Sequence, residues 1–165
     1  MLYSPVKHLS RFTVVVGLLL CINIYAEEIA TPPNEKEMST DVTVEDAYVN
    51  IPLPGKSTVA AYFTLHNKSA QDIALVSVRT TLTERAELHS HSHKDGVMRM
   101  RREDRVVIPA GSSVTFASGS WHVMLFNVTQ TLQTGEQLHL TLIFSDGTRL
   151  PVVAQVRSLF DQPHH

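Results

Sequence analysis

Cysteine is nearly absent from this sequence. The chain of 165 residues has a single one, Cys21, and it lies in the first hydrophobic segment. Residues 22–165 therefore cannot form a disulfide framework or a thiolate-bound metal site. A blue-copper electron-transfer centre also needs a cysteine ligand, so this absence argues against a copper-dependent redox enzyme.

Long hydrophobic runs and an excess of one charge are missing as well. The main apolar stretch runs from Phe12 to Ile22 and is shorter than the roughly 20 residues of a membrane-spanning helix. The formal net charge is only −2, which gives no electrostatic reason to expect a nucleic-acid partner. We find no nucleophile elbow, no glycine-rich phosphate loop and no HExxH motif, and we therefore expect no enzyme activity.

The N-terminus has the layout of a secretory signal peptide over residues 1–26. Lys7 and Arg11 precede the apolar run, and Ala26 supplies the small residue at a cleavage site. Leucines at 18–20 stand before Cys21, where lipid attachment favours small residues, so we predict cleavage rather than a lipoprotein anchor. The mature chain would be periplasmic, without a membrane span, and would carry 12 basic and 16 acidic residues, a net charge of −4.

The remaining residues have the pattern of one all-β domain. We predict a flexible leader over 27–40, the domain over 41–158 and a disordered tail over 159–165. Asp-Gly pairs at 95–96 and 146–147 are typical of hairpin turns. Short alternating strands with regular turn signals indicate an antiparallel sandwich or barrel. The predicted strands begin at Val42 and continue over 59–66, 73–78, 85–92, 97–102, 113–117, 121–128, 136–144 and 148–156.

Four soft, uncharged donor side chains are spaced through these strands. Ten residues separate His89 from Met100, twenty-one separate Met100 from His122, and one separates His122 from Met124. Among first-row ions, Cu(I) is the one that prefers thioether and imidazole ligands.

Strand geometry makes a shared site plausible. A two-residue turn at 95–96 places His91 directly opposite Met100 and makes His89 the diagonal neighbour of Met100. His122 and Met124 share one face of another strand, because side chains two residues apart project to the same side. Packing that strand against the hairpin would complete a four-ligand site.

The spacing of these residues resembles the signature of the periplasmic copper chaperone family called PCuAC. The resemblance covers about residues 42–156, essentially the whole predicted domain. Besides the four donors it includes blocks at Ala86-Glu87-Leu88-His89, Gly96-Val97-Met98-Arg99-Met100, Ile108-Pro109-Ala110-Gly111, Trp121-His122-Val123-Met124-Leu125 and residues 60–67.

What the resemblance implies is a cupredoxin-like Greek-key β-barrel that binds Cu(I) through His89, Met100, His122 and Met124. Members of the family deliver copper for cytochrome c oxidase assembly, so the implied partner is the oxidase copper subunit or a Sco-type thiol protein. We expect such a carrier to be a monomer.

One alternative uses a different set of donors. The run His89-x-His91-x-His93 is compatible with a periplasmic zinc or Cu(II) binding or storage module, or with a secondary Cu(II) site. His91, His93 and Met98 are also candidate auxiliary ligands of the Cu(I) site. His164 and His165 are most simply part of a solvated tail.

Overall fold

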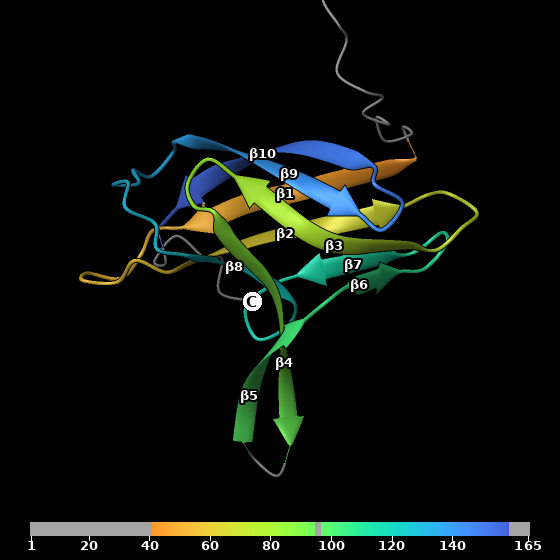
Figure 1. Ribbon diagram of the computed structural model, residues 1–165, viewed down its shortest axis with the longest axis horizontal. Coiled ribbons are helices and arrows are strands. Elements are labelled where there is room, and N and C mark those ends of the chain that lie inside the picture. Colours follow the sequence, from red (N-terminus) through yellow and green to blue (C-terminus); the bar gives the residue numbers. More distant parts are fainter. Residues whose placement is uncertain (1–40, 95–96, 159–165) are drawn as a thin grey trace, which may run out of the picture. The chain divides into compact units, whose positions relative to one another are not determined.

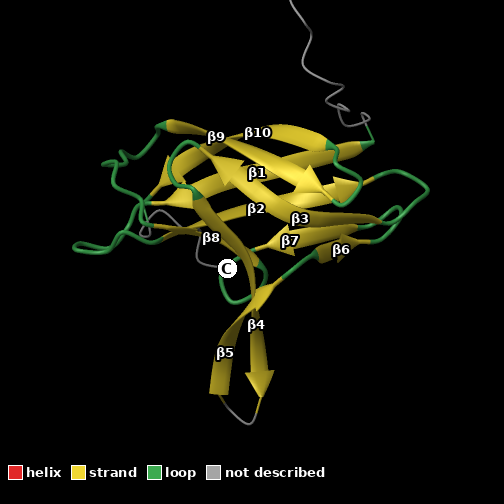
Figure 2. Cartoon of the chain, viewed as in Figure 1, coloured by secondary structure: helices red, strands yellow, loops and turns green. Residues whose placement is uncertain are grey.

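The computed structural model describes residues 41–94 and 97–158, and every regular element in these ranges is a β-strand (Figure 2). The all-β prediction is therefore confirmed. No segment of these ranges forms a helix with the length and apolarity that a membrane crossing requires. The strands are β1 (Val42–Asn50), β2 (Val59–Asn67), β3 (Ile73–Thr80), β4 (Arg85–Lys94), β5 (Val97–Glu103), β6 (Val106–Ile108), β7 (Ser113–Phe116), β8 (His122–Phe126), β9 (Gln137–Phe144) and β10 (Arg149–Arg157).

The strands form one mixed sheet in the order β5-β4-β8-β2-β1-β10-β9-β3-β6, and β7 also pairs with β2. β2 is central because β1 lies along one edge, while β8 and β7 share the other. Val59–Ala61 pair with β8, and Phe63–His66 pair with β7. One pair, β1 with β10, is parallel. The expectation of a wholly antiparallel arrangement was wrong at this pair, because a pairing between the first and last strands leaves no local signal in the sequence.

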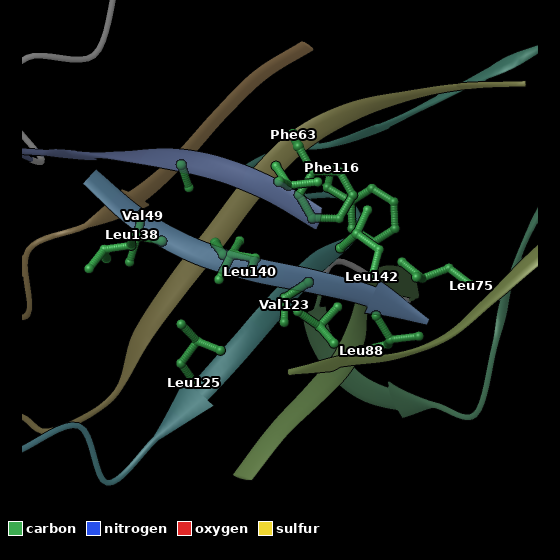
Figure 3. Close-up of a cluster of buried hydrophobic side chains, with 14 of the residues drawn as sticks. Val49, Phe63, Leu75, Leu88, Phe116, Val123, Leu125, Leu138, Leu140 and Leu142 are labelled. Carbon is green, nitrogen blue, oxygen red and sulfur yellow. The ribbon is translucent and has the colours of Figure 1, made fainter. Parts of the chain in front are cut away.

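Alternation along the strands builds the core. In β9, the side chains of Leu138, Leu140, Leu142 and Phe144 are buried while their neighbours are more exposed. Figure 3 shows the cluster of buried side chains that this pattern creates across several strands. Phe63 and Phe116 stack within it, with ring centroids 4.4 Å apart. The core fixes which face of each strand points outward.

β4 and β5 form a hairpin that extends away from the other strands (Figure 1). The first half of β4 also pairs with β8, from Arg85↔Phe126 to His89↔His122. Beyond His89, the sheet partner of β4 is β5 alone. His89 therefore stands at the point where the hairpin leaves the sheet.

Several predicted elements can be compared directly with the structure. The turn at 146–147 is confirmed: Gly147 has a positive φ of 83° and donates a backbone hydrogen bond to Phe144. The three-residue strand β6 was not predicted, since it is too short to show alternation. The predicted turn at 95–96, the signal peptide (1–26), the leader (27–40) and the tail (159–165) lie outside the described residues.

Candidate metal centre

Three strands bring the predicted donors to one outer face of the sheet. The register pairs His91 with Met100 across β4 and β5, as the two-residue turn predicts. It pairs His89 with His122 across β4 and β8. The alternate residues Leu88, Val123 and Leu125 point into the core and are almost fully buried. The donor face is therefore set by the same alternation that builds the interior.

His122 is the centre of this cluster. It is 3% exposed, and its Nδ1 donates a hydrogen bond of 3.0 Å to the carbonyl oxygen of Ser120. Burial lowers the pKa of His122, the carbonyl of Ser120 opposes that shift, and the nearby His91 and His89 add to it. A carbonyl can only accept, so the proton of the neutral ring lies on Nδ1 and the lone pair of Nε2 is free.

Met100 faces that free lone pair. Its sulfur lies 3.2 Å from Nε2 of His122. Neither atom carries a proton in the neutral form of the histidine, so two electron-pair donors point at each other. In a tetrahedral site, metal bonds of about 2.0 Å to nitrogen and about 2.3 Å to sulfur place the nitrogen and the sulfur roughly 3.5 Å apart. The distance between Nε2 of His122 and the sulfur of Met100 is close to this value. Met100 is also 49% exposed, which leaves this side of the pair open to an incoming ion.

His89 lies beside His122 across the β4–β8 pair, with ring centroids 5.8 Å apart. Its Nε2 lies 2.9 Å from a carboxylate oxygen of Glu87. The second oxygen of Glu87 accepts a hydrogen bond of 2.9 Å from Nε of Arg85. The bond to His89 and the contact with Arg85 both lower the pKa of Glu87, so Glu87 is an anion beside the cluster.

The auxiliary candidates lie on the same hairpin. The ring of His91 stacks on that of His122, with centroids 4.8 Å apart and an interplanar angle of 23°. Met98 is exposed, and its methyl group lies over Gly119, 4.0 Å from where a Cβ would stand. His93 pairs with Met98 in the backbone register, but its side chain lies outside the described atoms. The ring of His91 is therefore nearer to that of His122 than the ring of His89 is.

Met124 shares the outer face but adjoins a different hollow. It is half-buried, and its register partners are Ala60 on β2 and Glu87 on β4. It lines a shallow hollow with Tyr62 and residues of the loop before β2. The structure thus brings together His89, Met100 and His122. It places Met124 two residues further along β8 than His122, opposite Glu87.

Sequence reasoning missed Glu87 as part of this cluster. The signal was present, because Glu87 stands two residues before His89 on the same strand and so must share its face. For the alternative three-histidine site, no group of three histidine, cysteine or acidic side chains among the described residues is arranged to hold a metal ion. That alternative stays a prediction, because the side chain of His93 is not among them.

Comparison with known proteins adds a family and a fold. The profile of the family described as "Putative lipoprotein LpqE-like" matches residues 42–156. The protein "Putative lipoprotein Lxx21020" of Leifsonia xyli is 28% identical over 156 residues, 93% of each chain.

Two solved structures share this architecture. The solution structure of Cu(I)-bound DR1885 from Deinococcus radiodurans is 33% identical, with a TM-score of 0.61 over 74% of this chain and 81% of that one. The copper-bound PCuAC domain of PmoF2 is 22% identical, with a TM-score of 0.62 over 73% of this chain and 96% of that one. This second likeness concerns the fold alone, and the resemblance to PCuAC domains seen in the sequence is confirmed.

Proposed function

Because the chain belongs to the LpqE-like family, we propose on that premise that it is a periplasmic copper carrier that binds Cu(I) as its cargo. The ligands in this proposal are His89, Met100, His122 and Met124, with His91, His93 and Met98 as auxiliary donors. In this proposal the fold is a cupredoxin-like Greek-key barrel. The protein is made as a precursor whose signal peptide ends at Ala26. The carrier acts as a monomer without enzyme activity.

One observation carries the proposal: the sulfur of Met100 lies 3.2 Å from the unprotonated Nε2 of His122. A soft thioether facing a neutral imidazole is a ligand pair suited to Cu(I). The family supports the same interpretation, since the related DR1885 was solved with Cu(I) bound.

The ligand chemistry also supports delivery rather than permanent storage. All four proposed ligands are neutral, and thioethers are weak donors that an acceptor can displace one at a time. An acceptor with thiolates binds Cu(I) more tightly. We therefore propose the copper subunit of cytochrome c oxidase, or a Sco-type thiol protein, as the recipient.

Titration of Cu(I) against a competing chelator tests the site. We expect one Cu(I) per chain in the wild type and weaker binding in Met100→Ala and Met124→Ala. Loss of an outer partner of a metal ligand already costs about 10–100-fold in affinity, so loss of a ligand should cost at least about tenfold. Met38→Ala and His139→Ala remove the same chemical groups at positions outside the proposed ligand set and should bind as the wild type does. Unchanged affinity in both site variants would refute the proposal.

A further inference from the structure

We infer that Glu87 is a positioning residue: by holding Nε2 of His89, it assigns Nδ1 of that histidine to the metal. The inference rests on the proposed function, because it specifies how one of the proposed ligands meets the Cu(I) cargo. The observations behind it are a fixed carboxylate, a histidine with one free nitrogen, and a second histidine with the opposite arrangement.

The carboxylate of Glu87 is held at both oxygens. One oxygen accepts from Nε2 of His89 at 2.9 Å, and the other accepts from Nε of Arg85 at 2.9 Å. The side chains of His89 and Glu87 are only 12% and 11% exposed. Arg85 is steadied in turn by the ring of Phe126, whose centroid lies 4.5 Å from its guanidinium carbon. Because solvent competes little for the side chains of Glu87 and His89, the bond between them restricts the rotation of the imidazole.

Within the described part of the chain, the second nitrogen of His89 makes no hydrogen bond. Nδ1 is buried and has no hydrogen-bond partner among the described residues. A carboxylate accepts a proton-bearing nitrogen, so Nε2 of the neutral ring carries the proton and Nδ1 keeps its lone pair. A buried polar atom without a partner is costly, and a metal ion would satisfy this one. Carboxylates that orient a metal-bound histidine through its other nitrogen are a common arrangement.

His122 has the opposite assignment. Its Nδ1 donates to the carbonyl of Ser120, and its Nε2 faces the sulfur of Met100. The two histidines are register partners on β4 and β8. The site would thus bind copper through Nδ1 of one histidine and Nε2 of the other. In each histidine, the nitrogen that does not face the metal makes a hydrogen bond, and that bond leaves the other nitrogen free to bind copper.

Cu(I) is diamagnetic, so long-range ¹H–¹⁵N correlation spectra of the Cu(I)-loaded, full mature protein can identify the bound nitrogens directly. We expect Nδ1 of His89 and Nε2 of His122 to shift on loading, with Nε2 of His89 remaining protonated. Cu(I) bound through Nε2 of His89 would overturn the inference and leave the proposed function standing. A wild-type protein that binds no Cu(I) would overturn both.

Matched variants test the part played by Glu87. Glu87→Ala removes the acceptor and should weaken Cu(I) binding about 10–100-fold. In this variant the proton of His89 should no longer be confined to Nε2. Glu87→Gln keeps an amide oxygen that can accept the same hydrogen bond, so it should retain most of the affinity and the wild-type nitrogen assignment.

Glu103→Gln is the control for loss of charge in the same hairpin. Glu103 accepts a hydrogen bond of 2.6 Å from Ser90, and it pairs with Leu88, whose side chain points to the opposite face from His89. This variant should bind Cu(I) as the wild type does. If Glu87→Ala also matched the wild type in affinity and in the nitrogens bound, Glu87 would not be a positioning residue.

Discussion

Tyr62 shows how closely the outer face beside the candidate site is packed. It follows Ala61, whose partner on β8 is Val123, and so it adjoins the position of His122. Its ring lies 5.0 Å from that of Tyr48. Burial raises the pKa of Tyr62 above its usual 10.0, Tyr48 raises it further, and a hydrogen bond with Ser118 opposes both effects.

This shift predicts a loss of stability at high pH. Between the unfolded and folded pKa values, the folded chain keeps a proton that the unfolded chain releases, so the free energy of unfolding falls as pH rises above about 10. Tyr62→Phe should lower that free energy at neutral pH, because it loses the bond with Ser118, but should show a flatter decline in the alkaline range. Thermal melts of both proteins from about pH 8 to about pH 11 measure this. Parallel declines would contradict the prediction.

Individual donor positions were predictable where strand alternation alone decides them. A period of two places His122 on the face opposite to Val123 and Leu125. The structure agrees, since Val123 and Leu125 lie in the core while His122 contacts Met100 on the other face. The tautomer of His122 was not predictable, because it depends on the carbonyl of Ser120, a backbone atom in the preceding turn. Sequence identifies a side chain but not the partner of each of its atoms.

At the scale of elements, the β4–β5 hairpin was the most predictable feature. A two-residue turn fixes the register on both strands, and the observed pairs His91↔Met100 and His89↔Arg102 agree with it. The packing of the His122 strand against the hairpin, which a shared site requires, is observed as the pairing of β8 with β4. The pairing of β1 with β10 was beyond local reasoning, since β10 joins it from more than 90 residues away.

The β9–β10 turn allows a direct test of backbone conformation. Gly147 has φ of 83°, a region in which β-carbons are crowded and asparagine is better tolerated than other residues. The space around it is open: apart from its chain neighbours, no described residue has an atom within 4 Å of where a Cβ would stand. Backbone strain, and not a steric clash with neighbouring residues, therefore determines how much a side chain at position 147 lowers the free energy of unfolding.

We expect Gly147→Val to lower the free energy of unfolding by about 1–2 kcal/mol and Gly147→Asn to lower it by less. The difference arises because asparagine adopts the left-handed conformation more readily than a β-branched residue does. Urea titration of the wild type and the two variants measures both losses, and equal losses would contradict this account.

At the scale of the whole molecule, the proposed ligand set is soft, and the chain that follows Cys21 has no thiol. Residues 27–165 contain no cysteine, so disulfide formation within this part of the chain cannot inactivate the proposed site. The corresponding weakness is methionine oxidation, which converts a thioether into a polar sulfoxide. Of the two methionines among the four proposed ligands, Met100 is the more exposed and so the more open to that damage.

This ligand chemistry predicts the direction of copper transfer. When the Cu(I)-loaded protein is mixed with an equal amount of a reduced, metal-free Sco-type thiol protein, copper should move to the thiol protein, because thiolates are stronger ligands for Cu(I). Separation of the two proteins followed by copper analysis measures the distribution. An acceptor whose metal-binding cysteines are replaced by serine should receive little copper. Retention of most copper by the donor in the unmodified mixture would argue for storage instead.

The parallel pairing of β1 with β10 has a consequence for how the chain matures. Until residues 149–157 have been synthesised, one edge of the first strand lacks its hydrogen-bonding neighbour. A polypeptide interrupted before that point would leave Tyr48–Asn50 unpaired on that edge, a short template for association with other chains. The β1–β10 pairing can therefore form only after the last strand has been synthesised.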